Sequence, residues 1–423
     1  MRNIIMFFNR RLSVTSCDYL ARLKSFSHNA RQYLLFVFLT TLNQGIYGVI
    51  FNLYILSLGF REDFLGLILS LSSASIGLFA IPAALICDCL GRKNTLLLSS
   101  VLYTLSLIFL YNSTSRELLA ISSIAYGVAL ALSLVTGGTF LVENSTAYER
   151  MHLFSMYYII YTVSILSGNM VGGFLPGMLA DILSFEPEGA MSYRLTLYVS
   201  LAATIISLLP LSYIKEKSYP KNANMSHLKV YKSIFQSKTA CRMIFIFCLY
   251  GIGWGVSLPY FNVYFDTILG ADTSQIGIIF SASQLTMVIG YFLVPMLTEK
   301  LGKIKLASIV QVLSIPFLLM FTFTSSVLVA ALGYVMRWLL MNMANPILNS
   351  FKLEIVSNEQ RTIMNSLTWM ACYTFVGIGT YAGGLLMARG QNAMPFLITS
   401  VFYGITAILY YVYFNEVERR QNA

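Results

Sequence analysis

The sequence predicts an all-α integral membrane protein with twelve spanning helices in two parallel halves of six. The chain has 423 residues, of which 57% are hydrophobic and only 11% charged, and its mean hydropathy is +0.70. A soluble core could not bury this much apolar side chain. Apolar runs of about twenty residues recur along the chain, and a helix of about that length crosses a hydrocarbon layer about 30 Å thick.

Each span is expected to be a helix, because backbone groups inside lipid need hydrogen-bond partners within their own segment. The alternating ten-residue pattern of a membrane barrel is absent. The expected spans are 33–56, 64–87, 95–112, 118–142, 153–181, 193–214, 243–266, 275–298, 306–324, 328–353, 364–387 and 394–414.

Basic residues lie mainly on one side of this topology. The side that holds both termini carries 23 of the 28 Lys and Arg residues, with Lys352 and Arg361 counted among its loop charges. Because cytoplasmic loops are enriched in Lys and Arg, both termini are expected in the cytoplasm, and the net charge of +10 reflects orientation rather than nucleic-acid binding. We expect cytoplasmic tails at 1–32 and 415–423 and a location in the cell (plasma or cytoplasmic) membrane.

The second half of the chain repeats the first. A Phe-Asn-X-Tyr stretch at 51–54 returns at 261–264, an offset of 210 residues. Beyond it the offset is 211, and the matched pairs include Gly59 and Gly270, Gly66 and Gly277, Asp88 and Glu299, Gly91 and Gly302, Glu143 and Glu354, and Arg150 and Arg361. Matched charges and glycines at one spacing indicate duplication into halves 33–214 and 243–414, joined by a lysine-rich linker at 215–242. Such parallel repeats enclose a site near the bilayer midplane.

The loop after the second span reads Ala-Leu-Ile-Cys-Asp-Cys-Leu-Gly-Arg-Lys at 84–93. It resembles the signature loop of the major facilitator superfamily, with Ala84 where the first glycine is usual. Segment 143–150 resembles the acidic segment ending in Glu-Arg that is common there, and it repeats at 354–361. The resemblance implies the twelve-helix fold of that family and a gating network at the cytoplasmic side. The expected network comprises Asp88, Gly91, Arg92, Lys93, Glu143, Arg150, Glu299, Gly302, Lys303, Glu354 and Arg361.

In this interpretation the pairs Asp88/Arg92 and Glu299/Lys303 favour the outward-facing state. The alternative is that these charges only set topology and make turns.

A glycine-rich stretch lies in the fifth span, at 168–173. It resembles the antiporter motif of drug exporters, with Asn169 where a proline is expected. Small residues at this spacing also let helices approach closely, and the repeat at 379–384 favours that explanation. The glycines concerned are Gly168, Gly172, Gly173, Gly379, Gly383 and Gly384.

Polar residues inside spans are costly and therefore mark candidate functional positions. Arg337 is the only formally charged residue that is expected well inside a span. It is either a cavity-facing cation for a polar or anionic substrate or a partner of carbonyls and tyrosines between helices. The family resemblance implies that the first, fourth, seventh and tenth helices line the cavity. The candidate cavity residues are then Asn43, Gln44, Tyr47, Tyr126, Trp254, Arg337 and Asn342.

These features predict a secondary transporter of small organic molecules that works by alternating access. Proton-coupled efflux of amphipathic compounds is the first hypothesis, although no Asp or Glu is expected deep in a span. An importer or facilitator of a polar or anionic metabolite, and a lipid-moving or sensor protein on the same scaffold, remain alternatives. The expected partners are a small-molecule substrate, the bilayer and, if coupling exists, protons, with the chain as a monomer. No phosphate-binding loop or metal-ligand spacing occurs, so neither an enzyme nor a cofactor is expected.

Overall fold

A computed structural model describes residues 26–146, 149–186, 188–215, 227–357 and 360–422. Within these residues twelve helices are long and apolar enough to cross a membrane, and two of them are interrupted. Their bounds are α2 (His28–Ser57), α3 (Glu62–Leu90), α4 (Arg92–Asn112), α5 (Arg116–Glu143), α6 (Arg150–Leu183), α7 and α8 (Ala190–Ile206, Leu208–Ser212), α10, η1 and α11 (Lys238–Ser257, Leu258–Tyr260, Phe261–Thr267), α12 (Thr273–Leu301), α13 (Lys303–Phe323), α14 (Val327–Glu354), α15 (Arg361–Ala388) and α16 (Met394–Asn422). The first helix begins earlier, and the last ends later, than the hydropathy pattern indicated.

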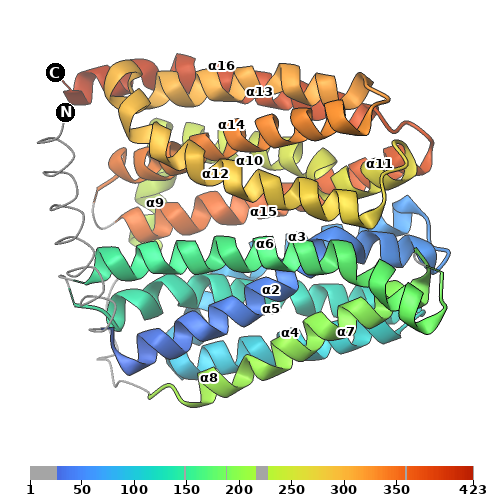
Figure 1. Ribbon diagram of the computed structural model, residues 1–423. Helices are drawn as coiled ribbons and strands as arrows, with labels where there is room; N and C mark the ends of the chain where they lie inside the picture. The colour runs from blue at the N-terminus through green and yellow to red at the C-terminus, as the bar shows by residue number, and fades with distance from the viewer. Residues whose placement is uncertain (1–25, 147–148, 187, 216–226, 358–359, 423) are drawn as a thin grey trace, which may run out of the picture.

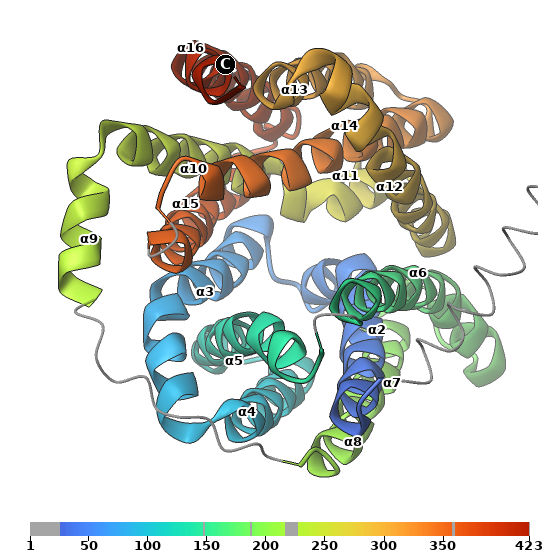
Figure 2. The same ribbon diagram turned by 90° about the vertical axis from the view of Figure 1, so that its left-hand side faces the viewer.

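The twelve spans divide into two bundles of six, and the bundles lie side by side (Figure 1). Helices α2 to α8 make the N-terminal half, and α10 to α16 make the C-terminal half. The largest contacts between the halves are those of α3 with α15 and of α6 with α12, and both can be followed in Figure 2. Smaller contacts join α2 to α11 and α12. Each contact pairs a helix with one from the other repeat, as expected for halves related by duplication.

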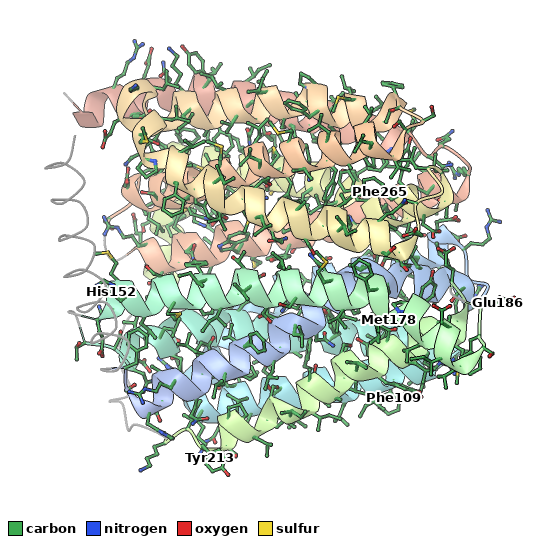
Figure 3. The ribbon with its side chains drawn as sticks, in the orientation of Figure 1. Phe109, His152, Met178, Glu186, Tyr213 and Phe265 are labelled. Carbon is green, nitrogen blue, oxygen red and sulfur yellow. The ribbon has the colours of Figure 1, made fainter. Side chains whose placement is uncertain are left out.

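Polar ends and apolar sides separate clearly on the surface. His152 and Tyr213 lie at one end of the bundle and Glu186 at the other, whereas the exposed Phe109 and Met178 lie on its sides (Figure 3). We call the end with Arg92, Lys93, Arg150 and Lys303 the basic end, and the other the opposite end. Exposed apolar side chains along the sides are those that lipid would cover.

The same glycine turn connects the second and third helices of each half. Gly91 has φ 82° and ψ 165°, and Gly302 has φ 83° and ψ 161°, a backbone conformation that glycine adopts most readily. Each glycine ends one helix and directly precedes the next. The duplication that the sequence indicated is therefore visible in backbone geometry.

The linker at 215–242 contains a short helix, α9 (His227–Gln236), and the start of α10. Ile234 of α9 is fully buried, and Ser233 accepts a hydrogen bond from Nε2 of Gln360 at 2.8 Å. The end of the linker is thus attached to the C-terminal half. Residues 1–25 of the expected tail and 216–226 of the linker lie outside the described residues.

Candidate functional site: two charged ends and a buried cationic interior

Arg92 organises the basic end of the N-terminal half. Its Nη1 lies 2.9 Å from Oδ1 of Asp88, and its Nε lies 3.1 Å from Oε1 of Glu143. Nη1 also donates to the backbone oxygen of Cys87 at 3.1 Å. The planar guanidinium can hold two carboxylates at once, so one side chain ties together the ends of α3, α4 and α5.

In the C-terminal half the corresponding network is smaller than the sequence suggested. Nζ of Lys303 lies 2.6 Å from Oε1 of Glu354, the repeat of the Arg92–Glu143 pair. The expected Glu299/Lys303 pair is wrong: Glu299 is exposed and has no hydrogen bond or ion pair among the described residues. A lysine ammonium is a single point charge, and here it is directed to the carboxylate on α14.

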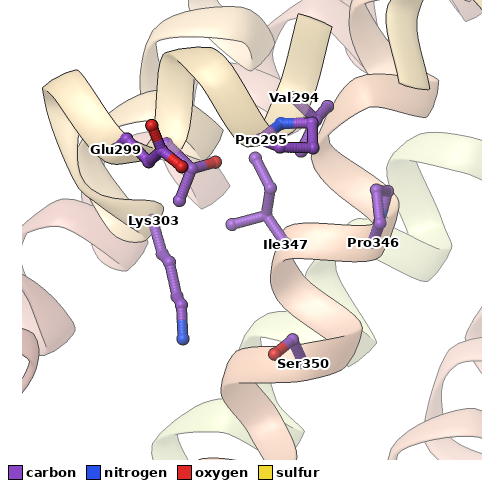
Figure 4. A pocket seen from close by; sticks show the side chains of 8 residues that line it. Val294, Pro295, Glu299, Lys303, Pro346, Ile347 and Ser350 are labelled. Carbon is purple, nitrogen blue, oxygen red and sulfur yellow. The ribbon is translucent and has the colours of Figure 1, made fainter. Parts of the chain in front are cut away.

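Glu299 instead lines a pocket of about 330 Å³ between α12 and α14 (Figure 4).

The remaining basic-end residues bond within their own half. Lys93 donates to the oxygen of Ser212, and Arg361 donates to that of Leu353 at 3.0 Å. Arg150 Nε donates to Oγ of Ser145 at 3.3 Å. The ion pairs and loop contacts of the basic end therefore join residues of one half at a time.

The glycine motifs sit where helices approach most closely. Gly168 and Gly172 pack against α2, and Gly379 and Gly383 pack against α10. The last glycine of each motif faces the other half: a Cβ on Gly173 would lie 2.9 Å from Cα of Gly277, and one on Gly384 would lie 2.7 Å from Cα of Gly66. A Cβ does not fit at such distances, so these four glycines are required for the halves to meet.

Two asparagines at repeat-related positions join the halves at the opposite end. Nδ2 of Asn52 donates to Oδ1 of Asn262 at 2.9 Å and to the oxygen of Pro259 at 2.5 Å. Nδ2 of Asn262 donates in turn to the oxygens of Val49 at 3.0 Å and Gly48 at 3.3 Å. Pro259 lies in η1, where the seventh span is interrupted, and such breaks expose backbone carbonyls for bonding. We call these contacts the asparagine lock.

The candidate cavity residues of the N-terminal half fall into two groups. Asn43 is fully buried, donates to Ser200 at 2.9 Å and accepts from Tyr103 at 2.9 Å, so it holds α2, α4 and α7 together. Tyr47 is half-buried and stacks on Tyr126, with ring centroids 5.4 Å apart. Gln44 is also half-buried. Tyr126 itself is buried, so Gln44 and Tyr47 are the two of these four residues with partly exposed surface.

In the C-terminal half, Arg337 is 2% exposed and lies among aromatic rings. Its Nη2 donates to the hydroxyl of Tyr403 at 2.6 Å, and its guanidinium carbon lies 5.2 Å from the ring centroid of Phe261. Nε has no hydrogen-bond partner in the part of the chain that the structure describes. Trp254 and Asn342 are half-buried, and Asn342 donates to the oxygen of Trp338 at 2.8 Å. The bond to Tyr403 agrees with the interpretation of Arg337 as a partner of tyrosines between helices. However, no carboxylate among the described residues balances the charge of Arg337.

Sequence reasoning missed a second buried cation. Lys352, counted as a cytoplasmic loop charge, is fully buried on α14, with Nζ 4.8 Å from the ring centroid of Trp369 and 5.2 Å from that of Phe247. The Cα–Cβ bond of a helical residue tilts toward the helix N-terminus, so a lysine two residues before the end of α14 points back into the span. Position alone could not distinguish this from an exposed charge.

Known proteins share this architecture. The family model described as Major Facilitator Superfamily matches residues 33–244 and 243–423, which is nearly the whole of both bundles. The chain belongs to the major facilitator superfamily. This is a family of membrane transporters, not enzymes, and the twelve-helix fold expected from the loop motif is confirmed.

Individual relatives are distant. A mutant form of the nucleoside transporter NupG has a TM-score of 0.75 at 15% identity, covering 91% of this chain and 100% of that one. A bacterial homolog of the human lysosomal transporter Spinster, inward-facing and occupied, has a TM-score of 0.72 at 14% identity over 91% and 96%. The hexose transporter HXT14 of Saccharomyces cerevisiae is 27% identical over 153 residues, 36% of this chain and 27% of that relative. The structural likenesses show the fold alone.

Proposed function

We propose that this member of the superfamily moves small organic molecules across the membrane by alternating access, with the basic end in the cytoplasm. The observation that carries the proposal is the distribution of contacts between the halves. The asparagine lock and the glycine pairs Gly66/Gly384 and Gly173/Gly277 close the opposite end, whereas the ion pairs of the basic end stay within one half. In this arrangement the opposite end, away from the cytoplasm, is closed. In the state that opens this end, the asparagine lock and the glycine pairs must separate.

Repeat symmetry supports the same mechanism. Both glycine pairs join one position of each half, and the asparagines of the lock are matched in the duplication. Two related halves with matched contacts at one end can rock about a central site without internal rearrangement of either bundle. NupG and the D-xylose-proton symporter, which has a TM-score of 0.67 to this chain, are named for polar organic substrates, in line with a small organic cargo here.

The test is transport by purified protein in liposomes, with a panel of labelled nucleosides, sugars, dyes and organic acids, and with and without a pH gradient. Gly173→Leu is the informative variant, because its side chain would occupy the space of Gly277 and wedge the opposite end open. Gly177→Leu on the same helix is the matched control, since nothing lies within 4 Å of its Cβ.

We expect flux of at least one solute in wild type and Gly177→Leu and its loss in Gly173→Leu. Dependence of the flux on the pH gradient distinguishes proton-coupled from uncoupled movement. Equal flux in both leucine variants, or none across the panel, would contradict the proposal.

A further inference from the structure

Lys352 is an ammonium enclosed by aromatic rings with no hydrogen-bond partner among the residues that the structure describes. Phe247 of α10 and Trp369 of α15 flank it at 5.2 and 4.8 Å. The nearest carboxylate in sequence, Glu354, is already bound by Lys303 and by Ser350, whose hydroxyl donates to it at 2.7 Å. Cation–π contacts alone replace only part of the hydration that an ammonium loses on burial.

Arg337 is a second buried cation on the same helix, fifteen residues earlier. At 1.5 Å per residue the two positions are separated by roughly 22 Å along the axis of α14, and by about 60° in rotation. One cation therefore lies deep in the C-terminal half and the other near its basic end. Two positive charges without a carboxylate partner among the described residues make this half favourable for an anion.

A series of neighbouring aromatic rings, one pair stacked and the others tilted, connects the two cations. Tyr403, over which Arg337 lies, is 5.9 Å from Tyr250 between ring centroids. The series continues from Tyr250 to Trp254 at 6.3 Å, from Trp254 to Tyr373 at 5.7 Å, and from Tyr373 to Trp369 at 5.8 Å, where it reaches Lys352. We call Tyr250, Trp254, Trp369 and Tyr373 the aromatic ladder.

The four rings of the ladder are half-buried, unlike Arg337 and Lys352. Each therefore presents part of its surface to accessible space while contacting the next ring. Flat unsaturated molecules stack favourably on such surfaces, and a charged group at one end of the molecule would be directed to a cation at either end of the ladder.

We infer that the substrate is an organic anion with a flat unsaturated body, and that Lys352 binds its anionic group at the end of the aromatic ladder nearest the basic end. The inference rests on the proposed transport function and adds the substrate class and the residue that selects it. In the present state Trp369 covers Nζ of Lys352, so movement of that side chain is needed before a carboxylate reaches the ammonium.

The experiment is calorimetric binding to the full chain in nanodiscs with matched pairs of ligands: benzoate and benzamide, 2-naphthoate and 2-naphthamide, indole-3-acetate and indole-3-acetamide. Lys352→Met removes the charge and keeps the length of the side chain. Lys300→Met, at an exposed position of the same end, removes one charge without touching the ladder.

In wild type and Lys300→Met we expect at least one carboxylate to bind roughly tenfold to a hundredfold more tightly than its amide, the range of a charge-assisted hydrogen bond. In Lys352→Met that preference should vanish while amide affinity is kept. Since an unpaired charge is replaced by an apolar group of similar volume, the thermal midpoint of Lys352→Met should equal or exceed that of wild type, which excludes misfolding as the cause.

A carboxylate preference that survives in Lys352→Met, or the absence of any preference in wild type, overturns the inference. Transport is tested separately. If liposomes move an uncharged solute while no carboxylate depends on Lys352, the proposed function stands and the assignment of an anionic substrate falls.

Discussion

Removing the asparagine lock should shift the balance between the two states of the protein. Asn52→Ala deletes the bonds from Nδ2 to Asn262 at 2.9 Å and to Pro259 at 2.5 Å. At about 1 kcal/mol for each bond, the closed opposite end loses ~2 kcal/mol relative to an open state in which the bonds are already broken. Because 1.4 kcal/mol is a factor of ten, the open population should rise about thirtyfold.

The assay is pulsed electron spin resonance on nitroxide labels at Thr114 and Ser325. Both side chains are exposed, they occupy loops at the opposite end, and they are equivalent in the repeat, with one on each half. We expect a longer distance to gain population in Asn52→Ala. Asn345→Ala serves as control, because its hydrogen bond to Asn342 at 3.2 Å stays within α14.

A double-mutant cycle with Asn262→Ala makes the test specific. The two asparagines share one bond, so the double variant should shift the equilibrium by less than the sum of the single variants. Unchanged distance distributions in both single variants, or strictly additive shifts, would refute the assignment of these residues as a joint lock.

Two further predictions concern stability. Glu418→Gln should lower the thermal midpoint, at a cost of about 1–2 kcal/mol, because this buried carboxylate accepts hydrogen bonds from the first two backbone N–H groups of α13 at 2.6 and 3.0 Å. Glu416→Gln, outside this contact, is the control. Equal midpoints for the two variants would exclude a capping role for Glu418. Tyr403→Phe should also lower the thermal midpoint, because it removes the only oxygen that accepts a hydrogen bond from Arg337 among the described residues. Adding Arg337→Met should restore part of the lost stability. No recovery in the double variant would contradict the pairing of Arg337 with Tyr403.

The sequence was sufficient for the spans, the halves and the turns because each depends on local or repeated features. Twenty-residue apolar runs imply helices in lipid whatever their neighbours are. Gly91 and Gly302 recur at matched positions next to basic residues, and both adopt the positive φ that such a turn needs. Spacing and the repeat favoured helix packing for the glycine motifs over an antiporter motif, but they did not indicate that Gly173 and Gly384 face the other half.

Contacts between helices that are far apart in the chain could not be predicted from the sequence. The Phe-Asn-X-Tyr stretch was noticed as a repeat, yet nothing in its pattern says that Asn52 and Asn262 hydrogen-bond to one another. Likewise, Lys352 lies so close to a helix end that its charge fits a loop, and its burial depends on rings contributed by α10 and α15. A signal was present in retrospect, since asparagine at both repeat positions within apolar spans needs a partner.

In the proposed transport cycle, the two buried cations of the C-terminal half would couple the molecule to the membrane voltage. Moving one elementary charge through a potential of 100 mV involves about 2.3 kcal/mol. If the halves rock as proposed, Arg337 and Lys352 move with the C-terminal bundle, and the anionic substrate inferred above would cancel part of their charge. The empty carrier would then be the more strongly charged form, so we expect the membrane potential to act chiefly on its return step.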